Sequence, residues 1–394
     1  NTKELLNSST NSNIIFKSPT GSGKTMICAE FPKRFTKEGK HTGKFSFIWI
    51  SVRRLHDQSK DKLEWHYESD HSLNCSNFED LTDKKIDENE ILFINWDSIN
   101  KKDKSVIIQE NEHDNNLNAV LKNTKDEDRQ IILIIDESHH TAGSDRSKEL
   151  IDIISPKITL EVSATPKLQE DASEIEKIGL SAVKEEEMIK SEIAINPEFM
   201  KIKLDAKSAT ELVIEQALKK REELKKLYEK EKSNINPLIL IQLPDKKEKQ
   251  DKKKDEIIKL LKDNFSISED KGNMAIWLSE KKSDTLPNIE KHDSEVDVLL
   301  FKQAIALGWD CPRASILVIF RESTSVIFTI QVIGRIMRMP EQMYYHKEPE
   351  LNRAFIFTNL STIQVAEDFA KDYVTIYESK RNESIYQDIH LKSI

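Results

Sequence analysis

The chain has 394 residues, of which 33% are charged and 37% are hydrophobic, and this length is enough for two domains with a core each. Its formal net charge of −9 gives no overall attraction to nucleic acid, although a local basic groove stays compatible with that value. Three widely spaced cysteines argue against structural disulfides, and no apolar run approaches the roughly 20 residues of a membrane span, so we expect a cytoplasmic protein.

The first recognisable element is a phosphate-binding loop. Its residues are Ser18, Pro19, Thr20, Gly21, Ser22, Gly23, Lys24 and Thr25. The loop follows an apolar run at residues 14–16 and precedes a predicted helix over residues 26–35. Glycines let backbone N–H groups curl around phosphate oxygens, while Lys24 would reach the β- and γ-phosphates and the Thr25 hydroxyl would bind Mg²⁺. Ser18 replaces the usual first glycine but is small enough for the turn. A chance Gly/Ser loop is disfavoured by the strand and helix around it.

Short apolar runs recur along the first half of the chain. They lie at residues 14–16, 45–50, 91–94, 131–135 and 160–162. Such runs are typical of strands in a parallel sheet covered by helices, and ligands of these sheets collect at the carboxyl ends of the strands. The run at 131–135 ends in Asp136 and Glu137, where Asp136 is placed to bind Mg²⁺ and Glu137 to orient or deprotonate a water molecule. His139 and His140 follow without zinc-site spacing, so we expect no metal there.

Two other strand ends carry small polar residues. The run at 160–162 leads into Ser163, Ala164, Thr165 and Pro166, whose hydroxyls can bond backbone or a neighbouring carboxylate. The run at 91–94 leads into residues 95–98, Asn-Trp-Asp-Ser, a composition that suits a turn closing a strand.

Taken in order, residues 18–25, 136–139 and 163–165 resemble motifs I, II and III of the superfamily 2 helicases. Asp-Glu-Ser-His-His followed by Val-Ser-Ala-Thr-Pro is similar to the ATPase subunit of type III restriction endonucleases. The resemblance implies ATP and Mg²⁺ as cofactors, and it gives His139, Ser163 and Thr165 a role in coupling hydrolysis to movement. Residues 95–98 also resemble a segment that contacts the nucleic-acid backbone in that group, and we weigh this interpretation evenly against the simple turn.

A long amphipathic helix over residues 212–228 separates the two halves, and Pro237 follows its end. New apolar runs then appear at residues 238–243, 275–278, 296–301, 316–320 and 355–357. The very polar stretch 245–255 is predicted as a mobile loop. The resemblance implies an α/β fold with two RecA-like P-loop NTPase domains, each a mostly parallel sheet flanked by helices. We expect an N-terminally truncated first domain over 1–195, and a linker helix with the second domain over 196–394.

Two stretches of the second half extend the resemblance. Gly308, Trp309 and Asp310 resemble motif V, which assigns Asp310 to the nucleotide sugar or to an arginine and places Gly308 in a loop of backbone contacts. The alternative is a buried tryptophan on a Gly/Pro turn. The segment around Arg335 and Arg338 resembles motif VI.

Gln331 opens this motif VI segment and would close on the nucleotide together with the two arginines. Arg335 and Arg338 are three positions apart, so they share one face if the segment is a helix. Facing a γ-phosphate, they would act as arginine fingers. Taken alone, two arginines at this spacing are more typical of surface ion pairs.

The resemblance implies an ATP-dependent DNA translocase or helicase, the motor part of a type III restriction enzyme Res subunit, with DNA and a methyltransferase or specificity subunit as partners and no membrane. One alternative is a superfamily 2 RNA or DNA-repair helicase. Another is an ATP-switched interaction protein without productive turnover. No glutamine precedes the phosphate loop, so ATP is inferred from the resemblance alone. No convincing nuclease core is found, and in the family that domain lies farther toward the C-terminus.

Overall fold

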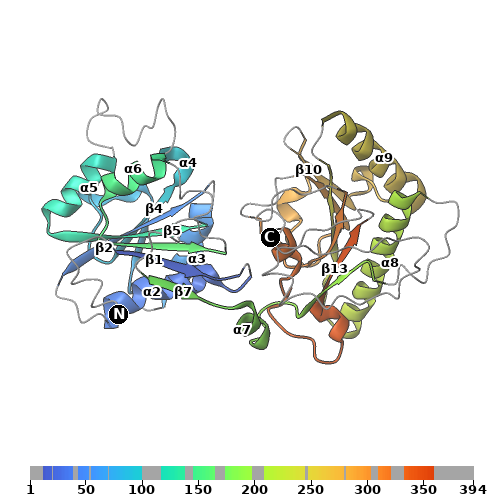
Figure 1. Cartoon of the computed structure of the whole chain (residues 1–394), viewed down its shortest axis with the longest axis horizontal. Coiled ribbons are helices and arrows are strands. Elements are labelled where there is room, and N and C mark those ends of the chain that lie inside the picture. Colours follow the sequence, from blue (N-terminus) through green and yellow to red (C-terminus); the bar gives the residue numbers. More distant parts are fainter. Residues whose placement is uncertain are drawn as a thin grey trace, which may run out of the picture. The chain divides into compact units, whose positions relative to one another are not determined.

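The chain divides into two compact units, residues 1–179 and 180–394 (Figure 1). The computed structural model describes residues 12–19, 21–38, 43–52, 55–69, 71–99, 117–137, 145–164, 174–197, 208–244, 247–278, 281–302, 309–320 and 332–358. Each unit is built on its own parallel sheet, and each is described here separately.

The first unit contains a seven-stranded sheet in the order β3-β4-β2-β5-β6-β1-β7. Its strands are β1 (Ser12–Lys17), β2 (Lys44–Ser51), β3 (Asn74–Ser76), β4 (Glu90–Asn95), β5 (Arg129–Asp136), β6 (Ile158–Ser163) and β7 (Glu174–Lys177). All neighbouring strands pair in parallel. The five apolar runs of the first half all lie in these strands, so that prediction is confirmed.

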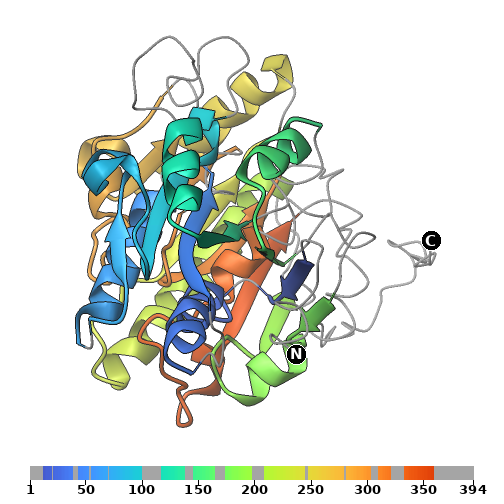
Figure 2. The same cartoon turned by 90° about the vertical axis from the view of Figure 1, so that its left-hand side faces the viewer.

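Helices cover both faces of this sheet. They are α2 (Lys24–Glu38), α3 (Leu55–Glu68), the short α4 (Trp96–Ile99), α5 (Leu117–Asp126) and α6 (Asp145–Ile154). The views in Figures 1 and 2 place α5 and α6 on one face and α2 on the other. Helices α2 and α3 pack together, since the Tyr67 hydroxyl donates to the carbonyl of Ala29 over 2.7 Å. Alternate residues of β2, including Phe47 and Trp49, join the core on this side.

The second unit contains a six-stranded sheet in the order β10-β11-β9-β12-β13-β8, again with parallel neighbours. Its strands are β8 (Glu192–Ile195), β9 (Leu238–Gln242), β10 (Met274–Trp277), β11 (Val298–Phe301), β12 (Ala314–Ile319) and β13 (Arg353–Thr358). Its helices are α7 (Leu180–Glu185), α8 (Ala209–Lys230) and α9 (Lys247–Phe265). Apolar residues of α8 and α9 share one core cluster with the strands, as the amphipathic pattern of residues 212–228 predicts.

Two sequence predictions about this unit need correction. The division between the units precedes β8, because β8 pairs with β13, so it falls earlier than the expected boundary between residues 195 and 196. The stretch 245–255 is not simply a loop, because α9 begins at Lys247. Lys, Glu and Gln are good helix formers, so a composition too polar for burial still favours a helix.

Among the helices in the described ranges, none is both long enough and apolar enough to cross a membrane.

Candidate nucleotide-binding site

Three neighbouring strands of the first sheet bring their carboxyl ends together. Strand β6 lies between β5 and β1, with Lys17 in register with Ser163 and Asp136 in register with Val162. The backbone N–H of Ser18 donates to the carbonyl of Ser163 over 3.2 Å. The phosphate loop, Ser163 and Asp136 therefore share one edge of the sheet, as parallel strands of this order require.

The phosphate loop is braced by its own hydroxyls. Gly21 and Gly23 have φ values of 87° and 74°, a left-handed conformation that a side chain would strain. The hydroxyls of Ser18 and Ser22 lie 2.5 Å apart, and the Ser22 hydroxyl is also 2.7 Å from the carbonyl of Pro19, to which it donates. Both serines are buried. Ser18 thus supplies a bond that the glycine of the common loop cannot make.

Lys24 connects this loop with the acidic residues on β5. It is the first residue of α2, and its side chain is only 8% exposed. Its Nζ donates to the carbonyl of Pro19 over 3.3 Å and lies 3.9 Å from Oε1 of Glu137. The ammonium group therefore sits between the phosphate loop and the carboxylate that follows β5, next to the helix N-terminus that favours anions.

Asp136 and Glu137 form a partly buried acidic pair. Burial, and then the negative charge of Glu137, raise the pKa of Asp136 to about 7, and Lys24 offsets only part of this effect. Glu137 has a φ of 54°, so the chain turns sharply as β5 ends. A divalent cation at this carboxylate would favour its charged form. The carboxylate and the half-buried Thr25 hydroxyl are the hard oxygen ligands that Mg²⁺ prefers, so the residues fit this ion.

The end of β4 forms a turn. The Asp97 backbone N–H donates to Oδ1 of Asn95 over 3.0 Å, and the Ser98 hydroxyl donates to the Asn95 carbonyl over 2.7 Å. The turn that the composition predicted is present, and its residues 96–98 belong to the short helix α4 (Trp96–Ile99). The nucleic-acid contact at these residues stays a prediction.

The arginines of the second unit meet the motif V residues. The Arg335 guanidinium donates to the carbonyl of Trp309, and Arg338 forms an ion pair with Asp310. Trp309 is buried and packs edge-on against Trp277, with ring centroids 6.1 Å apart. The pairing of Asp310 with an arginine is one of the two roles that the resemblance assigned to it.

The condition for both arginines to share one helical face is not met, because the helix does not extend to Arg338. Residues 332–336 are helical, so Arg335 is on a helix, whereas Arg338 lies beyond its end and forms an isolated bridge with Ile189. The two side chains still lie near each other, because Arg335 contacts residue 309 and Arg338 contacts the adjacent residue 310.

Five residues predicted for the site lie outside the described residues. They are Thr20, His139, Thr165, Gly308 and Gln331. Their assigned roles stay predictions.

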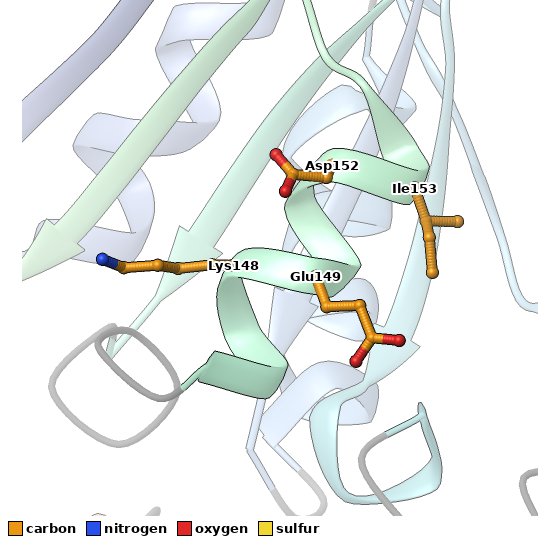
Figure 3. Close-up of a pocket in the computed structure, with 4 residues that line it drawn as sticks. All are labelled: Lys148, Glu149, Asp152 and Ile153. Atoms are coloured by element: carbon orange, nitrogen blue, oxygen red, sulfur yellow. The ribbon is translucent and has the colours of Figure 1, made fainter.

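A shallow depression on α6 is a different kind of surface (Figure 3). It is lined by Lys148, Glu149, Asp152 and Ile153, which all come from that one helix. Figure 3 shows Lys148 and Asp152 extending from one side of the helix and Glu149 and Ile153 from the other, so the four side chains do not converge on a common ligand. The phosphate loop and the acidic pair, in contrast, come from separate elements and do converge.

Comparison with known proteins shows what the chain resembles. Residues 1–168 match the family described as "Type III restriction enzyme, res subunit". The chain also resembles the ATP-dependent type ISP restriction-modification enzyme LlaBIII, solved bound to DNA, with 12% identity and a TM-score of 0.54. The family match covers less than half of the 394 residues, and at this low identity the likeness to the solved structure concerns the fold. No curated protein matches its sequence.

Two other solved structures extend this helicase likeness. The DUF1998 helicase MrfA, bound to DNA and AMPPNP, has 16% identity and a TM-score of 0.52. A variant of Saccharomyces cerevisiae Dbp5, bound to a Gle1 variant and IP6, has 13% identity and a TM-score of 0.51. The two parallel sheets flanked by helices thus have the RecA-like fold of the domains in these structures, as predicted.

The chain spans very different shares of these structural neighbours. The alignments cover 92% of the chain and 81% of Dbp5, 89% of the chain and 46% of MrfA, and 91% of the chain and 27% of LlaBIII. It therefore corresponds to less than half of MrfA and to about a quarter of LlaBIII.

Proposed function

We propose that the chain is an ATP-dependent DNA motor, the translocase or helicase part of a type III restriction Res subunit. The observation that carries the proposal is the position of Lys24, whose Nζ lies within hydrogen-bond distance of the phosphate loop and 3.9 Å from Glu137. A cation, a braced glycine loop and two carboxylates at one sheet edge are the parts that phosphoryl transfer to water requires.

Each of these groups has a distinct role in the proposal. The loop N–H groups and Lys24 bind the phosphates, while Thr25 and Asp136 hold Mg²⁺. The metal ion, when bound, neutralises charge that develops on the phosphate oxygens. Glu137 orients the attacking water and accepts its proton. The partly exposed Glu137 side chain can reach solvent, whereas Asp136 is buried, which suits these two different tasks.

The second unit supplies positive charge in the proposed cycle. Arg335 and Arg338 leave their partners at residues 309 and 310 and bind the γ-phosphate as arginine fingers. Hydrolysis removes the group that both units hold, and the units then separate. Ser163 is suited to transmit this change, because its carbonyl is bonded to the first residue of the phosphate loop.

DNA is the proposed partner because of the Res resemblance, and because MrfA and LlaBIII were both solved bound to DNA. A methyltransferase or specificity subunit as a further partner, and a cytoplasmic location, belong to the same proposal. An RNA or repair helicase and an ATP-switched binding protein are the competing outcomes of the test that follows.

The test is ATP hydrolysis by the purified chain, alone and with duplex DNA, single-stranded DNA or RNA. We expect DNA to stimulate turnover, and we expect Lys24→Ala to abolish it. Lys60→Ala is the matched control, because Lys60 is paired with Glu64 within α3, away from the phosphate loop, and its replacement should leave turnover unchanged. Stimulation by RNA alone would favour the RNA helicase. No stimulation by any nucleic acid would reject the motor.

A further inference from the structure

Lys190 is a buried lysine that the proposed cycle does not use. Its side chain is 0% exposed in the second unit. Its Nζ donates to the carbonyl of Ile336 and to the hydroxyl of Ser315, each over 2.9 Å. Ile336 is the last residue of the helical turn that carries Arg335. The ammonium group of Lys190 therefore caps the carboxyl end of this turn, where positive charge is favoured.

The backbone around Lys190 contacts the same segment. We call residues 332–338 the arginine segment. The Lys190 N–H donates to the carbonyl of Met337 over 2.8 Å, and Ile189 forms an antiparallel bridge with Arg338. One side-chain bond and two backbone contacts thus fix residues 189 and 190 along the end of the arginine segment, directly beside both arginines.

The other end of the same stretch contacts the end of β1, just before the phosphate loop. We call residues 178–190 the linker, since it leaves the first unit and enters the second. The Ile178 N–H donates to the carbonyl of Lys17 over 2.9 Å, and Lys17 immediately precedes Ser18 of the loop. One end of the linker is therefore hydrogen-bonded within the first unit, next to the phosphate loop, and the other end is hydrogen-bonded within the second unit, at the arginine segment.

Stability alone does not account for a lysine at position 190. Both of its side-chain hydrogen bonds go to neutral oxygens, and burial lowers the pKa of Lys190 to about 7. Burying an ammonium group without an opposite charge is unfavourable, and an apolar side chain of similar length would avoid that penalty. What an apolar side chain cannot provide is a donor that holds the Ile336 carbonyl in place.

We propose that Lys190 is a positioning residue that fastens the arginine segment to the linker and thereby sets the orientation of Arg335 and Arg338. Its importance for turnover rests on the proposed function. Its effect on the order of the arginine segment does not depend on that function. A misplacement of about 1 Å at a reacting centre lowers rates by about a hundredfold, so a fixed segment matters for catalysis.

The experiment compares Lys190→Met with Lys220→Met in the full chain. Met replaces lysine with an apolar side chain of similar length. Lys220 is a matched control, because it is buried in the same unit but forms ion pairs with Glu223 and Glu350, at 2.7 and 3.1 Å. Amide hydrogen exchange is measured for residues 335–338, and ATP turnover is measured with saturating DNA.

We expect amides of residues 335–338 to exchange about tenfold faster in Lys190→Met, which corresponds to the loss of about one hydrogen bond. We expect kcat to fall by about tenfold or more while KM changes by less than about threefold. Lys220→Met should leave both the exchange of this segment and kcat unchanged.

Unchanged exchange at residues 335–338 in Lys190→Met would overturn the proposal, whatever the turnover shows. Faster exchange together with unchanged kcat would also overturn the positioning role. Faster exchange in a chain whose wild type hydrolyses no ATP would support the fastening of the segment and would reject the proposed motor instead.

Discussion

The functional ends of the two sheets bury charges of opposite sign. In the first unit, the edge beside the phosphate loop buries the carboxyl of Asp136, and its pKa is raised to about 7. In the second unit, the region of residues 309–338 buries Lys190 and Arg335, and the pKa of Lys190 is lowered to about 7. The two units have the same kind of fold, but the first buries an acidic group and the second buries basic groups.

In the proposed function, this difference would divide the work of nucleotide hydrolysis between the two units. A buried carboxylate suits a metal ion, whereas guanidinium groups suit a phosphate that a metal does not cover. The backbone differs as well, because Gly21 and Gly23 take left-handed conformations in the first unit, where the chain curls around the expected phosphates. Each of the following variants removes a group from either the first unit or the second unit.

The largest effect is expected for Arg335→Ala. Removal of an arginine finger lowers turnover by about 10³-fold or more, because the charge of the transition state loses its partner. ATP affinity should change much less, since the phosphate loop remains intact. The measurement is single-turnover ATP hydrolysis with DNA present. Arg353→Ala is the control, because Arg353 pairs with Glu192 and Glu350 within the sheet and should affect stability but not turnover.

Glu137→Gln tests the acidic side of the contrast. The amide still fits the site but cannot accept a proton, so turnover should fall by about 10²- to 10⁴-fold while ATP still binds. Nucleotide binding is followed by fluorescence and turnover by phosphate release. Unchanged turnover would contradict the assigned role of Glu137 and would favour the ATP-switched binding protein.

The buried charges predict opposite pH dependences of stability. Asp136 is protonated more readily when folded, so the free energy of unfolding falls as pH rises from about 4 to 7, by at most about 1.4 kcal/mol per pH unit. Lys190 loses its proton more readily in the folded chain than in the unfolded chain. Its contribution to the free energy of unfolding therefore rises between about pH 7 and 10.5.

Urea unfolding in metal-free buffer at a series of pH values measures both slopes. Asp136→Asn should remove the lower-pH slope and leave the upper one, whereas Lys190→Met should do the reverse. If both variants keep the slopes of the wild type, the buried charges do not have the pKa values that the contrast requires.

The smallest effect is expected for Ser18→Ala. This change removes one side of the 2.5 Å contact between the Ser18 and Ser22 hydroxyls, so the first unit should lose about 1 kcal/mol of stability. Thermal unfolding measures the loss. Ser98→Ala, at the turn after β4, removes a comparable hydroxyl bond away from the loop and serves as the control for the effect on ATP affinity.

The sequence predicted the parts of the fold that depend on local pattern. Strands β1, β2, β4, β5 and β6 were visible because strands buried on both faces are apolar at consecutive positions. The meeting of Lys24 with Glu137 followed from strand order, since side chains at neighbouring carboxyl ends lie close together.

The sequence did not reveal the features that depend on distant contacts. Strand β8 is a four-residue segment whose pairing is decided by β13, far along the chain. Arg338 left the expected helical face because its backbone pairs with Ile189. Lys190 carried no local signal, because a lysine near other charged residues is normally solvated, and only the packing of residues 315 and 336 around it buries its side chain.

The pairing of β8 with β13 also sets an order of events on the ribosome. The sheet of the first unit has all its strands once β7 has been translated, but β8 has no neighbour until β13 emerges. Ser191 and the residue it bonds, Asn352, are 161 positions apart. At about 5–20 residues per second, Ser191 and β8 therefore remain without their partners for about 10 to 30 s after they are synthesised. Lys190 is therefore enclosed late, because its partners Ser315 and Ile336 are translated long after the strands of the first unit.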